Sequence, residues 1–258
     1  MEEIKKALET IAATDLTRLM KVEESAVALE NLLLNRRLAL SKGRELIACL
    51  RKNGILAKLQ ALYETYETNL EINFAREIIR NNMSDYGQYP LYKRFLSLIK
   101  NELRLVHMEK PTHALFTGSG PFPITAILLN KLSGCTVDCY EKNMEYADLS
   151  HKVISQLGLA DKIRIFNRRG EYLTHDGHPI VVIAVLAKPK DKILQKVLGK
   201  ISSHTRIICR TADGLRLAFY EAADPEYLKP FKIMGVNYAG GSQTISSILL
   251  KKETSRRV

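Results

Sequence analysis

A glycine-rich segment near the middle of the chain has the composition of a nucleotide-binding loop. Gly118, Ser119, Gly120 and Pro121 follow a short apolar run and precede a helical one. The two glycines let the backbone turn sharply and approach a ligand, beside a helix N-terminus that carries a partial positive charge. Pro123 stands where a dinucleotide fingerprint would have its third glycine, so the loop favours a nucleoside such as S-adenosylmethionine.

Two polar residues follow the next apolar runs, where the carboxyl ends of strands are expected. Glu141 comes about 20 residues after the glycine loop, a position from which a carboxylate accepts hydrogen bonds from both ribose hydroxyls. The alternative for Glu141 is an acidic residue at a helix start or on the surface. Asn167 is a candidate neighbour of the adenine ring.

The pattern of apolar residues predicts the elements that must hold this loop. Through the first hundred or so residues, apolar side chains recur at spacings of three and four, which indicates helices. After Pro111, short apolar runs about 25 residues apart alternate with helical stretches, which predicts a parallel, doubly wound sheet. The expected strands are 113–116, 136–140, 163–166, 180–186, 206–209 and 245–250.

The predicted fold class is therefore α/β. We expect an all-helical N-terminal segment, the doubly wound sheet after it, and a boundary between them near residue 110. In such a sheet the ligand lies beyond the carboxyl ends of the strands, at the point where the strand order reverses.

Composition and charge limit the classes of partner that we expect for this chain. With 46% hydrophobic and 26% charged residues, the chain of 258 residues can bury a full core. No apolar run reaches the roughly 18 residues of a membrane span and the N-terminus lacks a secretion pattern, so we expect a cytoplasmic protein without a membrane partner. The net charge of +11 is spread singly or lies in the C-terminal tail, without interleaved aromatic residues, so we expect no nucleic-acid partner.

The cysteines and histidines predict no bound metal. The four cysteines show no Cys-x-x-Cys spacing, and we expect them to be reduced core thiols. The six histidines are scattered and fit no clear site. His175 and His178 lie close in the sequence, but in a turn-rich stretch that is not typical of metal ligands.

The run LFTGSGPFPITAILL, residues 115–129, resembles the nicotianamine synthase family, whose loop reads Gly-Ser-Gly-Pro or Gly-Gly-Gly-Pro before apolar, Pro, apolar and Thr. The similarity spans roughly residues 65–250. Further motifs that resemble the family are Tyr-Pro-x-Tyr at 89–92, Leu-Ser-x-Lys-Val-Ile at 149–154, Ala-x-Leu-Ala-x-Pro-Lys at 184–190 and Arg-x-x-x-Gly-x-Arg-x-x-x-Tyr at 210–220.

This resemblance implies an N-terminal all-helical cap domain, residues 1–110, over a Rossmann-like class I S-adenosylmethionine-binding domain, residues 111–258. It also implies a reaction. An acceptor amine attacks the γ-carbon beside the sulfonium of S-adenosylmethionine, and methylthioadenosine leaves. The glycine loop, Glu141, Asn167 and Ala184 are the expected cofactor contacts. The step needs a base and alignment of the reacting atoms, but no metal and no covalent intermediate.

The resemblance also implies catalytic residues. In the family, a glutamate on a cap helix and the second tyrosine of Tyr-Pro-x-Tyr face the reacting amine, which places these roles on Glu71 and Tyr92. Glu77 competes with Glu71 but lies on another helical face. The alternatives are a solvated helix face for Glu71 and Glu67, and ordinary packing for Tyr92 and for Tyr89, an expected substrate contact.

Arg210 and Asp213 are the expected contacts of the acceptor. Arg210 ends the fifth predicted strand, where it can reach a carboxylate of the acceptor or of the cofactor; the alternative is a structural salt bridge. The pair Asp213-Gly214 resembles bacterial enzymes that make opine-type metallophore precursors from histidine, whereas the plant synthases carry His-Gly there. We therefore expect histidine as the acceptor.

Three other functions stay open at this point. A nicotianamine synthase would repeat the transfer with acceptors derived from S-adenosylmethionine. An RNA methyltransferase shares the loop and Glu141, but usually has Asp/Asn-Pro-Pro-aromatic where this chain has Leu-Ala-Lys-Pro-Lys at 186–190. A sensing module would bind the cofactor without releasing methylthioadenosine. A homodimer is the assembly that we consider.

Overall fold

The computed structural model describes residues 2–34, 39–107, 111–170 and 177–253. By their packing these residues form two compact units. The first contains the described residues of Met1–Leu70, Thr211–Ala222 and Tyr238–Ser246, and the second those of Glu71–Arg210, Ala223–Asn237 and Ser247–Val258. No helix in the described ranges is both long and apolar enough to cross a membrane.

The first unit is helical, as the spacing of its apolar residues predicts. Leu8, Leu29 and Leu50 are fully buried, each from a different helix. The helices of this unit are α1 (Glu2–Ala12), α2 (Leu19–Leu34), α3 (Leu40–Lys52), the first part of α4 (Ile55–Arg80) and the short η3 (Gly214–Ala218).

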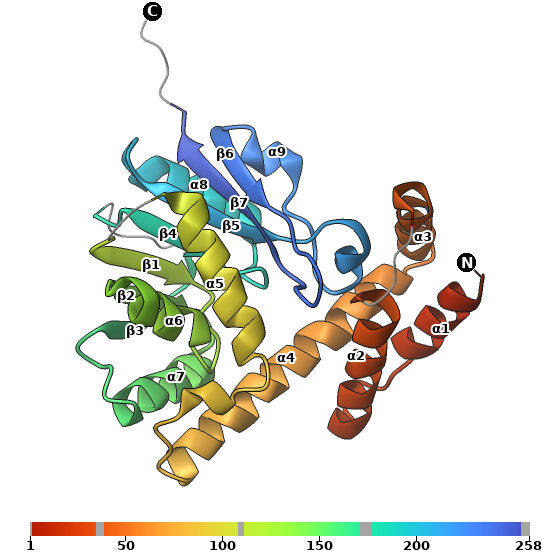
Figure 1. Cartoon of the computed structure of the whole chain (residues 1–258), viewed down its shortest axis with the longest axis horizontal. Helices are drawn as coiled ribbons and strands as arrows, with labels where there is room; N and C mark the ends of the chain where they lie inside the picture. Colours follow the sequence, from red (N-terminus) through yellow and green to blue (C-terminus); the bar gives the residue numbers. More distant parts are fainter. Residues whose placement is uncertain (1, 35–38, 108–110, 171–176, 254–258) are drawn as a thin grey trace, which may run out of the picture. The chain divides into compact units, whose positions relative to one another are not determined.

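The second unit is built on a seven-stranded sheet in the order β3-β2-β1-β4-β5-β7-β6 (Figure 1). The pairs among β1 to β5 are parallel, and β6 and β7 are antiparallel. The predicted Rossmann-like α/β fold is thus confirmed. The strands are β1 (His113–Thr117), β2 (Thr136–Glu141), β3 (Ile163–Asn167), β4 (Ile180–Ile183), β5 (Arg206–Thr211), β6 (Phe231–Asn237) and β7 (Ser246–Lys252).

The remaining elements belong to the second unit. Its α-helices begin and end as α5 (Tyr92–Val106), α6 (Ile124–Ser133), α7 (Met144–Gln156), α8 (Lys190–Lys200) and α9 (Pro225–Leu228), and η1 spans Tyr86–Gln88. The end of α4 also lies here, since the border between the units falls at Leu70.

The strand order reverses between β1 and β4. From β1 the chain moves to β2 and β3 on one side, and β4 then pairs with the other side of β1. Ligands of open α/β sheets bind beyond the carboxyl ends of the strands at such a switch point. The glycine loop follows β1 and Ala184 follows β4, so both lie at this point.

The sheet differs from the predicted one at its edge. The edge strand β6 was not predicted, because Lys232, Ile233 and Met234 are all exposed and hide the alternation of a half-buried strand. A register irregularity between Ile233 and Gly235 further breaks its pattern.

The packing groups the residues differently from the predicted division at residue 110. Residues 71–107, including α5, pack with the sheet, whereas residues 211–222 and 238–246 pack with the N-terminal helices. The division into a cap domain over residues 1–110 and a Rossmann-like domain over residues 111–258 stays a prediction.

A buried ion pair holds α5 to the sheet. Arg210 of β5, which is 2% exposed, binds Glu102 of α5 through Nε and Nη2, at 2.9 and 3.0 Å. Its Nη1 donates to Thr125 Oγ1 at 2.9 Å, and Ser247 Oγ donates to Glu102 Oε1 at 2.6 Å. Two charges can be buried away from water here because they neutralise each other and their polar atoms are hydrogen-bonded.

Replacing Glu102 by Gln should lower the free energy of unfolding by about 3–5 kcal/mol, since it leaves the Arg210 guanidinium buried without a counter-charge. Urea unfolding measures the loss. Asp148→Asn is the matched control because its partner Lys152 is 58% exposed; there we expect a change within about 0.5 kcal/mol. Equal losses in both variants would contradict the role of the buried pair.

Candidate functional site

The glycine loop adopts a backbone that side chains disfavour. Gly118 and Gly120 have φ angles of +77° and +70°. The N–H of Gly118 donates to the carbonyl of Tyr140 at 2.8 Å, which ties the loop to β2. A Cβ on Gly118 would lie 3.0 Å from Ala187 Cβ and 3.3 Å from Ala184 Cβ, so the loop packs on the residues that follow β4.

Glu141 lies at the carboxyl end of β2 and contacts the loop directly. Its Oε2 accepts a hydrogen bond from the N–H of Gly120 at 2.9 Å, and its Oε1 accepts one from the N–H of Asn143, also at 2.9 Å. The residue is 6% exposed. Each carboxylate oxygen retains a second lone pair, so Glu141 can still accept from a ligand hydroxyl.

Glu71 reaches the same glycine from α4. A Cβ added to Gly120 would lie 2.3 Å from Glu71 Oε2, so the carboxylate occupies the space that a side chain would fill. Glu71 is half-buried, whereas its competitor Glu77 is exposed. Two carboxylates from distant parts of the sequence therefore converge on Gly120.

Two hydroxyls of this region are buried without a hydrogen-bond partner among the described residues. Thr117 ends β1 and is 0% exposed, and Ser119 lies in the loop and is 4% exposed. A buried hydroxyl without a partner loses free energy, so such groups in a loop fit a ligand that supplies the missing hydrogen bond.

Pro121 and Asn167 complete the expected cofactor contacts. Pro121 is buried where the loop enters α6. The Nδ2 group of Asn167 donates to the carbonyls of Glu141 and Lys142 at 3.1 and 3.3 Å, and its side chain is exposed at the end of β3. The side chain of Asn167 thus lies beside Glu141, and its role as a neighbour of the adenine ring stays a prediction.

The two tyrosines of the Tyr-Pro-x-Tyr motif lie in different surroundings. Tyr89 is 2% exposed, and its ring centroid is 4.9 Å from that of Phe122, which follows the glycine loop, and 5.4 Å from that of Phe74. Tyr89 thus packs against the residue that follows the loop, and its role as a substrate contact stays a prediction. Phe122 was not predicted as a site residue, although it lies within the motif that carries the resemblance.

Tyr92 instead lies beside the C-terminal half of α6. Lys131 Nζ donates to the Tyr92 hydroxyl at 3.2 Å and lies 5.2 Å from the centroid of the Tyr86 ring. The hydrogen bond with Tyr92 and the field of Tyr86 raise the pKa of Lys131. The structure therefore groups Tyr92 with this lysine, and its catalytic role stays a prediction.

Arg210 has the geometry of the structural alternative. Its guanidinium is committed to Glu102 and Thr125, and the residue is buried. The sequence predicted the position of Arg210 at the end of β5, but it did not predict that Glu102 would be its partner. Its predicted role as an acceptor contact receives no support from this geometry.

The rest of the motif at 210–220 is also held internally, within the first unit. Arg216 donates to the carbonyls of Gln243 and Gly241 at 2.7 and 3.0 Å. The Tyr220 hydroxyl donates to Glu67 Oε1 at 2.6 Å, and burial and the charge of Glu67 raise the pKa of Tyr220. Glu67 is 5% exposed, so it does not decorate a solvated face.

Asp213 belongs to this same network. Its Oδ1 accepts a hydrogen bond from Ser246 Oγ. Its role as an acceptor contact stays a prediction.

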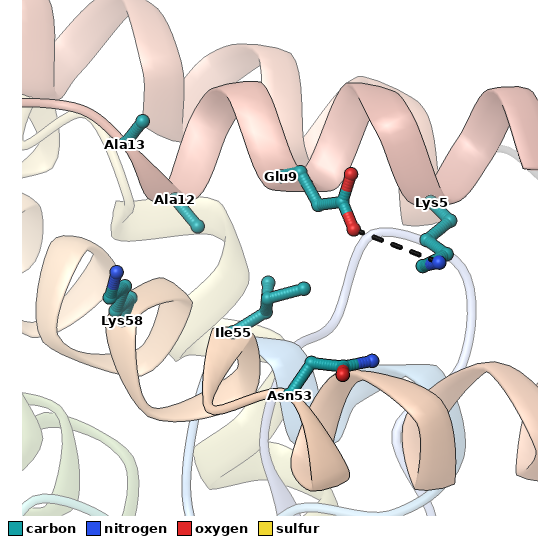
Figure 2. A pocket seen from close by; sticks show the side chains of 7 residues that line it. All are labelled: Lys5, Glu9, Ala12, Ala13, Asn53, Ile55 and Lys58. Carbon is teal, nitrogen blue, oxygen red and sulfur yellow. Dashed lines mark ion pairs between the residues drawn. The ribbon is translucent and has the colours of Figure 1, made fainter.

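A surface cavity of about 370 Å³ lies elsewhere in the first unit (Figure 2). Lys5 and Glu9 of α1 face Asn53 and Ile55 across the cavity. The Nζ atom of Lys5 is 3.8 Å from Oε1 of Glu9. None of the predicted site residues lines this cavity.

Comparison with known proteins agrees with the motifs. A solved structure described as MtNAS in complex with MTA and tNA has a TM-score of 0.87 and 26% identity, and the match covers 98% of each chain. A second, of a glutamate-to-glutamine variant of MtNAS in complex with S-adenosylmethionine, has a TM-score of 0.86, 26% identity and the same coverage.

Curated relatives match over shorter stretches. The L-histidine 2-aminobutanoyltransferase of Yersinia pestis is 26% identical over 125 residues, 48% of this chain and 47% of its own. Nicotianamine synthase 2 of Arabidopsis thaliana is 25% identical over 185 residues, 67% of this chain and 58% of its own. The chain thus spans about half the length of the curated relatives it matches.

The family model described as nicotianamine synthase protein matches residues 40–257, which include the glycine loop, Glu71 and Glu141. Because this match covers most of the chain, the protein belongs to the nicotianamine synthase family.

Proposed function

We propose that this protein transfers the 3-amino-3-carboxypropyl group of S-adenosylmethionine to the α-amine of an amino acid and releases methylthioadenosine. The observation that carries the proposal is the convergence of Glu71 and Glu141 on Gly120. A cofactor-binding carboxylate and a candidate base thereby lie at one loop. The relatives named for aminobutanoyl transfer and nicotianamine synthesis support the same reaction.

The adenosine part of the donor fits the carboxyl edge of the sheet. Glu141 would accept from the ribose hydroxyls, the hydroxyls of Thr117 and Ser119 would gain their missing partners, and Asn167 would lie beside the base. Gly118 and Gly120 leave room for the backbone to approach the ligand, because neither carries a side chain.

Glu71 has the properties of the base that the reaction needs. The sulfonium of S-adenosylmethionine makes methylthioadenosine a good leaving group: a nitrogen–carbon bond forms as the carbon–sulfur bond breaks, and the bonding pair stays on sulfur. Only a neutral amine has the lone pair to attack, so the proton must leave the acceptor. The half-buried carboxylate of Glu71 is placed to take that proton.

Histidine is the acceptor that we propose, toward an opine-type metallophore. The Yersinia pestis relative is named for transfer to L-histidine, and the Asp213-Gly214 pair supports the same choice. The second candidate, a nicotianamine synthase, is favoured by the plant relatives and by the solved neighbour that binds MTA and tNA. The cytoplasmic location and a homodimer stay predictions.

Glu71→Gln should lower turnover by roughly 10²–10⁴, the range for loss of a positioned base, and leave the dissociation constant for S-adenosylmethionine nearly unchanged. Release of methylthioadenosine measures turnover, and calorimetry measures binding. Glu77→Gln, on the same helix but exposed, is the control and should be near wild type. A wild-type rate for Glu71→Gln would move the role of base to another residue.

Gly120→Ala should weaken cofactor binding and slow turnover, because the new methyl group displaces the Glu71 carboxylate and strains the loop. Gly134→Ala is the matched control: its φ is +76°, so the backbone cost of about 1–2 kcal/mol is similar, but nothing lies within 4 Å of the new Cβ. We expect normal cofactor affinity and turnover in Gly134→Ala, and loss only in Gly120→Ala.

The two substitutions should not act independently. If Gly120→Ala slows turnover by displacing Glu71, it should cost less in the Glu71→Gln background than in the wild type, and a double-mutant cycle measures the difference. Rate losses that simply multiply would separate the glycine from the base and contradict this geometry.

A further inference from the structure

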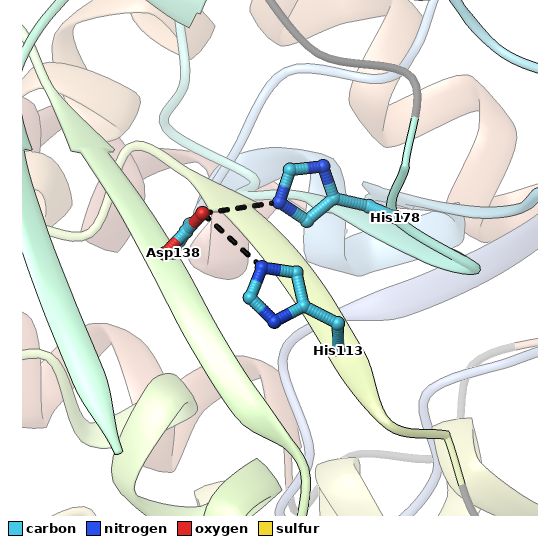
Figure 3. Close-up of side chains that lie close together, drawn as sticks. All are labelled: His113, Asp138 and His178. Carbon is cyan, nitrogen blue, oxygen red and sulfur yellow. Dashed lines mark hydrogen bonds and ion pairs between the residues drawn. The ribbon is translucent and has the colours of Figure 1, made fainter. Parts of the chain in front are cut away.

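Three side chains from distant parts of the sequence meet at the amino-terminal ends of the parallel strands, opposite the end that carries the glycine loop. His113 is the first residue of β1, Asp138 lies early in β2, and His178 precedes β4. Figure 3 shows both imidazoles directed at the Asp138 carboxylate. The glycine loop and Glu141 follow the carboxyl ends of these parallel strands, so this cluster lies at the amino edge, away from the proposed transfer site.

Two of the histidines that are scattered in the sequence, His113 and His178, lie together in the structure. Their rings are stacked, with centroids 4.6 Å apart and planes inclined at 27°. The sequence offered no signal, because residues 113 and 178 are brought together only by the pairing of β1 with β4. His175, the other member of the pair considered from the sequence, lies outside the described residues.

The distances within the cluster are those of metal ligands. His113 Nε2 and His178 Nε2 are each 3.2 Å from Asp138 Oδ2. One possible ligand atom from each of the three residues lies within 4.8 Å of the other two. Zinc bonds to histidine nitrogen and carboxylate oxygen are about 2.0–2.1 Å long, so two ligands at a tetrahedral angle are about 3.3 Å apart. Both nitrogen–oxygen separations match that edge.

The surroundings hold the donor atoms in place. Asp138 and His178 are 7% and 5% exposed, whereas the side chain of His113 is 27% exposed and leaves one side open to solvent. The Nδ1 atom of His113 is hydrogen-bonded to Thr136 Oγ1, which directs its Nε2 toward the carboxylate. Second contacts of this kind orient the histidine ligands of metal sites.

Arg164 is the group with which a cation would compete. Its Nε and Nη2 donate to Oδ1 and Oδ2 of Asp138 at 2.7 and 2.9 Å. Its side chain is 58% exposed, so the guanidinium can withdraw from Oδ2 into solvent and keep its bond to Oδ1. Because the side chain of Asp138 is only 10% exposed and the contact is bidentate, a cation must displace a real interaction, and this competition lowers its affinity for the site.

We propose that His113, Asp138 and His178 form a binding site for a divalent transition metal such as zinc, with water as the fourth ligand. Two histidines, one carboxylate and an open position form a known zinc ligand set. The site is separate from the transferase reaction, which requires no metal.

Calorimetric titration of the chelator-treated full chain with zinc tests the proposal. We expect one zinc ion per chain. His113→Gln removes the most accessible ligand and should weaken binding about 100-fold or more, and Thr136→Val removes only the partner of His113 and should weaken it about 10–100-fold. His151→Ala is the control, since His151 is exposed on α7, and should bind like the wild type.

Cobalt absorption and thermal unfolding provide second measurements. Cobalt in this site should give the visible spectrum of a tetrahedral complex, and zinc should raise the Tm of the wild type but not that of His113→Gln. Circular dichroism and the Tm of each metal-free variant show that it is folded. Absence of zinc binding in the wild type, or equal binding in wild type and His113→Gln, would overturn the proposal.

Discussion

Gly120 has no side chain, and the carboxylate of Glu71 occupies the space where its Cβ would be. From the other direction, the backbone N–H of the same residue is bound by Glu141. Both carboxylates can approach because Gly120 has no Cβ, and an added Cβ would displace the Glu71 carboxylate. An added side chain would also strain the loop, since the φ of Gly120 is positive. The pairing of the proposed cofactor-binding carboxylate, Glu141, with the candidate base, Glu71, depends on this single residue.

The sheet supplies the rest of the arrangement. Because strand order reverses between β1 and β4, the glycine loop after β1 faces Ala184 and Ala187 after β4. The buried Arg210–Glu102 pair connects β5 to α5 behind this edge. A charged pair with no access to water gives no excess of stability, but it is satisfied in only one arrangement of the two elements.

Much of the candidate site could be predicted from local sequence motifs, but little of the packing around it could. Glu71 was inferred from the family resemblance, and the roles of the site residues stay predictions. The glycine loop and the place of Glu141 at the end of a strand could be predicted from a short motif and from the order of elements. The partner of Arg210 could not, since Glu102 is more than a hundred residues away in sequence and only packing brings it close. The edge strand β6 was missed because its exposed apolar residues break the alternation. His113 and His178 likewise meet only through strand pairing.

The product formed from S-adenosylmethionine distinguishes aminocarboxypropyl transfer from methyl transfer. Purified protein incubated with S-adenosylmethionine, with and without histidine, is examined by mass spectrometry. We expect methylthioadenosine together with a histidine adduct that is heavier than histidine by one aminobutanoate unit. Methylthioadenosine with an adduct that lacks histidine would keep the transfer but change the acceptor to that of a nicotianamine synthase. Formation of S-adenosylhomocysteine would mean methyl transfer and would contradict the proposed transfer of the 3-amino-3-carboxypropyl group.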